Sequence, residues 1–262
     1  MRTSRPTPIA HRPSARSAFT MIEIAMALAI IGFALVAIIG ILPMGMDVQK
    51  NNRRETIINQ DANFFIEAIR NGAHGLDDLT KYVAAIVVTS NGAPHYYRNT
   101  DPMFSGFPIP TGLPAAETLE LTNGAIIIGL LSTPKYTAST TYKVEAYVKA
   151  LSGAATEKSP QANAIINEAA FSYRMVPEIV AYNDRYYDPT WVNSTNQRVF
   201  DSLGKNLYDV RLLFRWPLLP GHEASGLPKL GNGRQVYRLM VSGELKNETA
   251  ETWFFQPQSY TP

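Results

Sequence analysis

The sequence predicts an α+β protein in which one long N-terminal helix precedes a mainly β domain. Three observations lead to this prediction. Residues 24–42 form an uncharged apolar run, residues 47–71 carry apolar side chains at helical spacing, and residues 76–262 alternate strand-like segments with turn residues. We expect the second half of the helix to pack on an antiparallel β-sheet.

The composition limits the function classes. A chain of 262 residues with 45% hydrophobic and 18% charged residues can bury a core. Four of the 24 basic residues lie in the first 18 residues, which hold no acid, so the rest of the chain carries a net charge of −2. This balance argues against a nucleic-acid binder. The absence of cysteine excludes disulfides, thiolate metal sites and cysteine nucleophiles.

The apolar run predicts a membrane-spanning helix. Residues 24–42 contain no charge, and residues 19–46 are apolar apart from Thr20 and Glu23. About 20 residues of helix cross a hydrocarbon layer about 30 Å thick. A buried core helix is the alternative, but such a helix normally keeps a polar face. The arginines before the run place the N-terminus in the cytoplasm and the later residues beyond the membrane.

Residues 17–33, "SAFTMIEIAMALAIIGF", resemble the N-terminus of type IV pilin precursors and type II secretion pseudopilins. The resemblance implies that a prepilin peptidase cuts between Ala18 and Phe19 and that Phe19 is then N-methylated. Ala18 departs from the glycine that usually precedes the cut. The segment 210–243 resembles, more faintly, the Verru_Chthon cassette group of pilin-like proteins.

The resemblance also implies a location and a domain organisation. The chain would be a single-pass protein of the bacterial inner membrane with a periplasmic C-terminal domain. Its partners would be the prepilin peptidase and other pilin-like subunits of a type IV pilus or a type II secretion-like pseudopilus. The expected parts are a leader (1–18), a transmembrane assembly half-helix (19–46), an amphipathic half-helix (47–75) and an extracytoplasmic mainly β domain (76–262).

Glu23 is the acid within the apolar run. A charged side chain in a bilayer normally has a partner, because its desolvation is unfavourable. Cleavage before Phe19 would create an amine within about one helical turn of Glu23, in the same or a neighbouring subunit. We expect this amine and Glu23 to pair and to set the register of assembly. The alternative is a Glu23 that reaches the lipid headgroups without a partner.

Small and helix-weakening residues mark the same half-helix. Ala25, Ala29, Gly32 and Gly40 lie near one helical face, where small side chains let helices approach closely in lipid. Gly32, Gly40 and Pro43 also weaken a helix, so we expect a kink or a melted turn in this region. Ordinary use of glycine in a transmembrane helix is the alternative.

Beyond Asp47 the pattern becomes amphipathic and then changes to strands. The helix is expected to end at Gly72 or Gly75, and the sheet to close over a stripe that contains Ile58, Phe65 and Ile69. Residues 117–131 are predicted to form a hairpin around Asn123-Gly124. The other expected strands are 82–90, 141–151, 171–182, 207–216, 234–245 and 251–256.

No catalytic residue and no cofactor is predicted. The four histidines are scattered and show no metal-binding spacing. The loop 182–191 holds Asp184 and Asp188 among aromatic residues. The two aspartates are weak candidates for calcium ligands, and the aromatic residues could form a partner contact. The alternative is an ordinary solvated loop.

Three functions from different classes remain. The leading one is a pilin-like structural subunit whose role is assembly. The second is a membrane-anchored extracytoplasmic binding protein that never assembles and keeps residues 1–18. The third is an anchored enzyme, which needs a clustered polar pocket that the sequence does not display.

Overall fold

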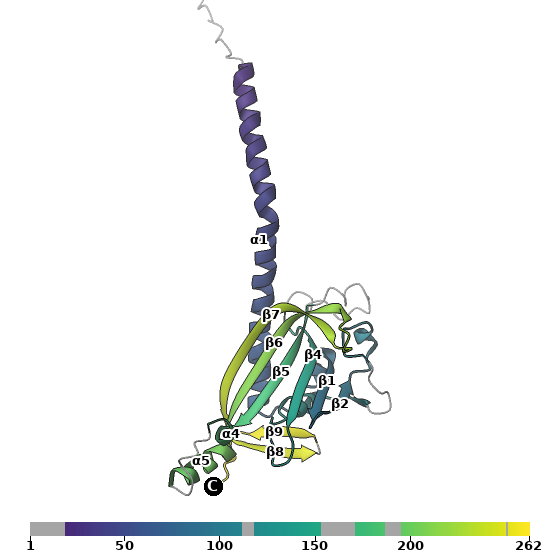
Figure 1. Cartoon of the computed structure of the whole chain (residues 1–262), viewed down its shortest axis with the longest axis vertical. Coiled ribbons are helices and arrows are strands. Elements are labelled where there is room, and N and C mark those ends of the chain that lie inside the picture. Colours follow the sequence, from purple (N-terminus) through teal and green to yellow (C-terminus); the bar gives the residue numbers. More distant parts are fainter. Residues whose placement is uncertain (1–18, 112–117, 153–170, 187–194, 250) are drawn as a thin grey trace, which may run out of the picture. The chain divides into compact units, whose positions relative to one another are not determined.

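The computed structural model describes residues 19–111, 118–152, 171–186, 195–249 and 251–262. The chain divides into two compact units, Met1–Asn52 and Arg53–Pro262. The first part of helix α1 (Met21–Arg70) belongs to the first unit and its last part belongs to the second. The second unit also contains a curled sheet, whose strands come after α1 in the chain (Figure 1). The predicted α+β class is confirmed.

The second unit consists mainly of β-strands with short helices between them. The strands are β1 (Val83–Ser90), β2 (Ala93–Arg98), β3 (Thr118–Glu120), β4 (Tyr142–Lys149), β5 (Ser172–Ala181), β6 (Leu207–His222), β7 (Pro228–Ser242), β8 (Glu244–Thr249) and β9 (Thr252–Gln256). The short helices are η1 (Asp77–Lys81), η2 (Pro102–Phe104), α2 (Gly124–Leu131), α4 (Tyr182–Tyr186) and α5 (Thr195–Asn206).

Seven strands form the main sheet in the order β3-β2-β1-β4-β5-β6-β7. Neighbouring strands are antiparallel except for the parallel pair β2 and β3. Strands β8 and β9 form a separate antiparallel pair. The prediction of a mostly antiparallel sheet is therefore confirmed, with one parallel pair at the β3 edge.

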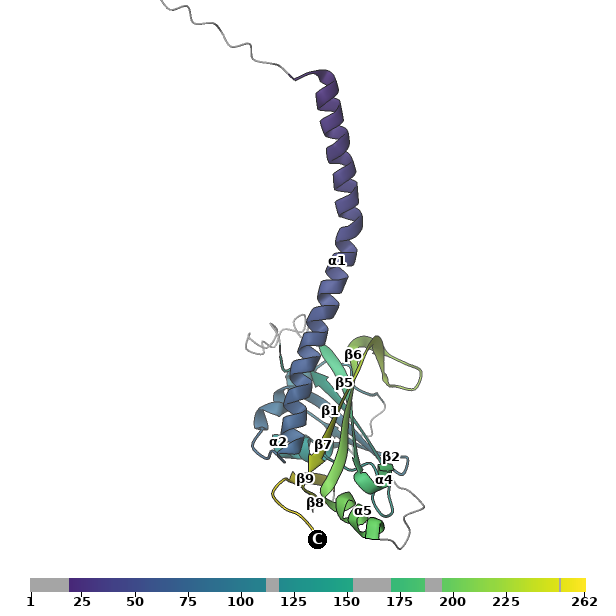
Figure 2. The same ribbon diagram turned by 90° about the vertical axis from the view of Figure 1, so that its left-hand side faces the viewer.

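The last five turns of α1 supply one side of the hydrophobic core. Ile58, Phe65 and Ile69 are fully buried, and they belong to the same cluster as Ile86, on β1, and Phe214, on β6. Figure 2 shows this part of α1 along the concave side of the sheet. The stripe that the helical spacing predicts thus meets the sheet, as expected.

Helix α1 ends through a glycine cap. The N–H of Ala73 donates to the carbonyl of Ala68 at 3.0 Å, and the N–H of Gly72 donates to the carbonyl of Ile69 at 3.1 Å. Gly72 has φ of +57°, and a Cβ there would lie 2.2 Å from the carbonyl oxygen of Phe255. Only glycine fits this end of the helix, which confirms the predicted stop.

The hairpin predicted around Asn123-Gly124 is wrong. Asn123 instead caps α2, since its side chain accepts a hydrogen bond from the N–H of Ile126 at 2.8 Å. A Cβ on Gly124 would lie 1.8 Å from the carbonyl oxygen of Leu76, so this glycine serves a close backbone contact. The same two residue types favour a hairpin turn or a helix start, and the packing against η1 decides between them.

Replacement of Asn123 by alanine tests this cap. Because the side chain satisfies an otherwise unpaired helical N–H, Asn123→Ala should lower the free energy of unfolding by about 1 kcal/mol. Urea unfolding of the full chain in detergent, followed by tryptophan fluorescence, measures the change. The matched control is Asn123→Asp, which keeps a side-chain acceptor for the N–H of Ile126 and should retain most of the stability. An equal loss in both variants would contradict the cap.

Further elements escape the sequence prediction. No strand is predicted for the residues of β2 or for most of β8, and α5 lies between two predicted strands. Strand β6 extends beyond its predicted end at residue 216, and β7 begins before its predicted start at residue 234 but ends at Ser242, before the predicted end at residue 245. The two strands form a long ribbon. These differences lengthen the sheet but do not change its class.

A buried carboxylate joins α1 to the sheet. Asp61 is fully buried and accepts hydrogen bonds from the N–H of Leu151 at 2.9 Å, the N–H of Ser152 at 3.0 Å and the hydroxyl of Tyr173 at 3.0 Å. Burial is the main cause that raises the pKa of Asp61 above its ordinary value of 3.8, although these hydrogen bonds oppose the shift. Asp61 thus fixes the segment after β4, and Tyr173 on β5, against the helix.

The raised pKa of Asp61 predicts a pH dependence of stability. Between 3.8 and the raised pKa, the folded chain binds the proton more readily than the unfolded chain. The contribution of Asp61 to the free energy of unfolding therefore falls as the pH rises through this range. Asp61→Asn lacks the titrating group, so the wild-type chain should gain stability relative to this variant as the pH falls. Urea unfolding of both chains at several pH values measures the difference; a constant difference would contradict the prediction.

Candidate assembly helix

The first part of α1 exposes apolar side chains on all of its faces. Every residue from 19 to 52 is exposed; Phe33, for example, is 80% exposed and Ile39 is 69% exposed. Within the described residues, α1 is the one helix long and apolar enough to cross a membrane. An apolar surface of this extent is covered by lipid or by other helices.

Thr20 and Glu23 form a capping box at the start of α1. The N–H and the hydroxyl of Thr20 both donate to Oε2 of Glu23 at 2.8 Å, and the N–H of Glu23 donates to Oγ1 of Thr20 at 3.3 Å. These bonds satisfy backbone groups that a helix start leaves unpaired. Glu23 therefore has a local structural role that the interpretation of its charge alone did not include.

The second carboxylate oxygen of Glu23 is available. Both bonds from Thr20 go to Oε2, and Oε1 has no hydrogen-bond or ion-pair partner in the described part of the chain. A carboxylate can accept several hydrogen bonds, and a charged donor gives the strongest of them. The capping box thus orients Glu23 without saturating it.

The sequence contains the signal for this cap. Threonine followed three residues later by glutamate, directly before an apolar run, is typical of a helix N-terminus. Phe19, one residue before the cap, is 82% exposed. Ala18 lies outside the described residues, so cleavage between Ala18 and Phe19 and methylation of Phe19 stay predictions.

The helix is continuous across Gly32, Gly40 and Pro43, and no melted turn occurs there. Apart from the adjacent residues and the nearby backbone of α1 itself, no atom lies within 4 Å of the position that a Cβ would occupy on Gly32 or Gly40. Contacts within the described chain therefore give no reason for these glycines. The weakening of the helix at these residues stays a prediction about the assembled state.

The chain has a long apolar N-terminal helix, and the last turns of this helix pack on a mostly antiparallel sheet. The architecture is pilin-like. Comparisons with protein-family models, with curated proteins and with solved structures find no match. The pilin-like description therefore depends on the helix and the sheet of this chain themselves.

The candidate calcium ligands are only partly described. Asp184 lies in α4, and burial raises the pKa of its carboxyl group, while Asp188 lies outside the described residues. In the described ranges, no group of three or more His, Asp or Glu side chains is arranged to hold a metal ion. A calcium site at this loop stays a prediction.

The described histidines do not form a cluster. His74 stacks on the ring of Phe254 with centroids 4.1 Å apart, and His95 lies 3.6 Å from a carboxylate oxygen of Glu251. The ring Nε2 of His222 lies 2.8 Å from the carbonyl oxygen of Ile109. Each one serves a separate local contact, and His11 lies outside the described residues.

Proposed function

We propose that this chain is a pilin-like structural subunit. A prepilin peptidase removes residues 1–18, the apolar half-helix holds the subunit in the inner membrane, and helix packing then incorporates it into a pilus or a pseudopilus. Its globular domain faces the periplasm and performs no chemistry in this process. The observation that carries the proposal is the apolar part of α1, exposed on every face and headed by an incompletely paired carboxylate.

Glu23 supplies the specificity of this assembly. In an apolar surrounding, a carboxylate with one free oxygen attracts a cationic donor more strongly than in water. The amine of a cleaved Phe19 on a neighbouring subunit is such a donor. Since one amine meets one carboxylate, the pairing selects a single axial offset between adjacent helices.

The small residues support close helix packing. Ala29 and Gly32 lie on the face that also includes Ala25 and Gly40, and the glycines have no intrachain neighbour. Small side chains let two helix backbones approach and gain dispersion energy in lipid.

Disulfide cross-linking between subunits tests whether the helices assemble. The chain has no cysteine, so a single cysteine gives an unambiguous product. Ala29→Cys places a thiol on the small-residue face, and Ala27→Cys makes the same change at nearly the same depth on the opposite face. After mild oxidation of native membranes, we expect covalent dimers from Ala29→Cys and few from Ala27→Cys. Equal yields or no dimers from either variant would favour a tethered domain.

A further inference from the structure

The outer side of strands β4 to β7, opposite the core, carries an excess of positive charge together with Lys135 before β4 and Arg185 in α4. We call this surface the basic face and define it by Lys135, Lys143, Arg174, Arg185, Arg211, Arg215, Arg234, Arg238, Glu145, Glu178 and Asp209. It holds eight basic and three acidic residues, in a chain with 24 basic and 22 acidic residues overall. The remaining 16 basic and 19 acidic residues of the chain therefore carry a net charge of −3.

Three arginines lie in one row across the basic face. Arg215 on β6 is opposite Arg174 on β5 and opposite Arg234 on β7. Like charges that face one another across strands destabilise a sheet. Arg174 has Glu145 at 3.2 Å, whereas neither Arg215 nor Arg234 forms an ion pair with a described residue.

Buried donors in this row also lack acceptors. The Nε atoms of Arg174 and Arg215 are buried and have no hydrogen-bond partner among the described residues. An unpaired buried donor is unfavourable, and a charged one more so. Arg234, at the β7 end of the row, is exposed and open to a partner of opposite charge.

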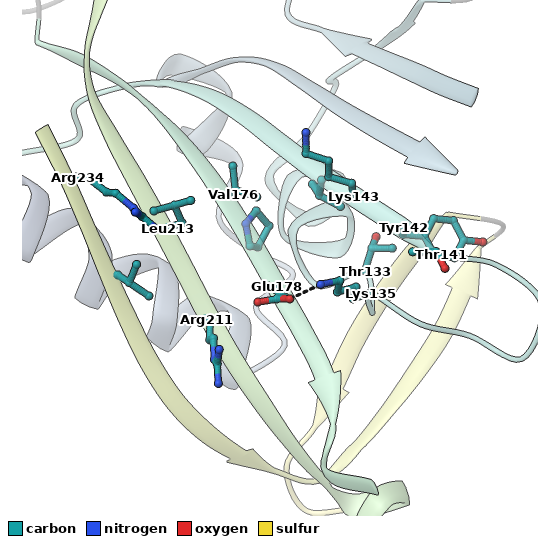
Figure 3. Close-up of a pocket in the computed structure, with 13 residues that line it drawn as sticks. Thr133, Lys135, Thr141, Tyr142, Lys143, Val176, Glu178, Arg211, Leu213 and Arg234 are labelled. Carbon is teal, nitrogen blue, oxygen red and sulfur yellow. Dashed lines mark hydrogen bonds and ion pairs between the residues drawn. The ribbon is translucent and has the colours of Figure 1, made fainter. Parts of the chain in front are cut away.

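An apolar row and a second basic row follow along the strands. Val176, Leu213 and Val236 are aligned across β5, β6 and β7, and Val236 is 49% exposed. These side chains line a groove of about 440 Å³, together with Lys143, Glu178, Arg211 and Arg234 among others (Figure 3).

The second basic row ends at β7 as well. Arg211 is aligned with Arg238, and both share the buried carboxylate of Asp209 with Arg185. Three guanidinium groups thus meet at one carboxylate, and Glu178, 3.4 Å from Arg185, is a second acid beside them. Arg234, Val236 and Arg238 consequently form a basic, apolar, basic series at every second residue of β7.

Strand β7 is the last strand of the sheet, and its 15 residues make it longer than most strands. Apart from its pairing with β6, no backbone hydrogen bond joins residues 229–242 to another described segment. Figure 1 shows β7 along the outer edge of the sheet. Basic side chains on such an edge oppose pairing with a second basic strand, but they favour pairing with an acidic strand.

We propose that β7 accepts an extended acidic segment of a partner protein as an eighth strand. The added strand places an acidic side chain beside Arg234, an apolar side chain beside Val236 and a second acidic side chain beside Arg238. The recognised pattern is acid, any residue, apolar, any residue, acid, which is the same for either strand direction. Backbone bonds to β7 supply affinity, and the two carboxylates supply specificity.

A synthetic peptide tests this proposal on the full chain in detergent. The probe is a blocked, fluorescent peptide in which Glu, Thr, Val, Thr and Glu follow one another between Ser-Thr ends. Its isomer exchanges the second glutamate with the preceding threonine, which moves one carboxylate to the other face of a strand. Fluorescence anisotropy should show that the periodic peptide binds the chain. The affinity of the isomer should be about ten-fold lower.

Variants of the chain locate the binding. Arg234→Glu should weaken binding of the periodic peptide about ten-fold or more, because it replaces attraction by repulsion. Arg98→Glu makes the same charge change on exposed β2, near the other edge of this sheet, and should change the affinity by less than about two-fold. Equal losses in both variants would contradict docking at β7.

Peptide backbone methylation tests strand addition itself. N-methyl groups on alternate residues remove the donors of one peptide edge only. One of the two complementary sets should abolish binding and the other should not. Equal binding of the periodic peptide and its isomer would overturn the proposal, as would no binding at about 1 mM peptide. So would Arg234-dependent binding of duplex DNA or polyphosphate alone, since that result would assign the basic face to polyanions.

Discussion

Replacement of Glu23 by valine is expected to abolish assembly into filaments while cleavage before Phe19 continues. Valine suits the membrane and keeps the apolar run, so insertion should persist. It removes the carboxylate whose Oε1 is available for a neighbouring amine. Filaments sheared from cells, and the membrane fraction that remains, can be compared by immunoblot. The variant should be present in the membrane at normal amounts and absent from filaments.

Two companion variants separate the charge of Glu23 from its capping role. Glu23→Gln keeps an acceptor for the N–H of Thr20 but removes the negative charge, so assembly should fail as with valine. Thr20→Val removes the hydroxyl of the cap but keeps the carboxylate, so assembly should survive. If Glu23→Gln assembles normally, the capping box explains Glu23 and the amine pairing is wrong.

Removal of the buried Asp209 carboxylate is expected to have the largest effect on the stability of the β domain. Its side chain is fully buried, with Nε of Arg185 at 3.1 Å and Nε of Arg238 at 2.8 Å. Asp209→Ala would leave three guanidinium groups close together without their common anion. Because these arginines are partly exposed and can turn toward water, we expect a loss of about 3 kcal/mol, the lower end for a broken buried pair.

Urea unfolding of the full chain in detergent measures this loss. The matched control is Asp201→Ala, which removes an exposed carboxylate from α5 and should change the free energy of unfolding by less than about 0.5 kcal/mol. A similar midpoint for both variants would show that the arginines do not depend on Asp209.

The periodic parts of the structure could be predicted from the sequence. The long apolar run and the stripe at Ile58, Phe65 and Ile69 repeat at helical spacing, so α1 and its buried face follow from local pattern. Most strands follow from apolar segments bounded by turn residues. The Thr20 cap was also encoded locally, in its spacing to Glu23.

The parts that depend on distant partners could not be predicted. Asp61 is buried because Leu151 and Tyr173 supply its hydrogen bonds from far along the chain. Helix α2 forms because Gly124 meets Leu76, a contact that no local pattern reveals.

The basic face shows the same limit. Arginines four residues apart in β6 and in β7 indicate that each strand has one basic side. Only the register, which sets Arg215 opposite Arg234, brings the two sides together. The register in turn depends on tertiary packing.

The mass of the N-terminal peptide from chain isolated from its native membrane tests the central claim most directly. Assembly as a cleaved subunit predicts a peptide that begins at Phe19 and carries one added methyl group on its amine. A mature chain that retains residues 1–18 would have no amine near Glu23. That result would contradict the assembly account and leave a domain tethered by its N-terminal helix.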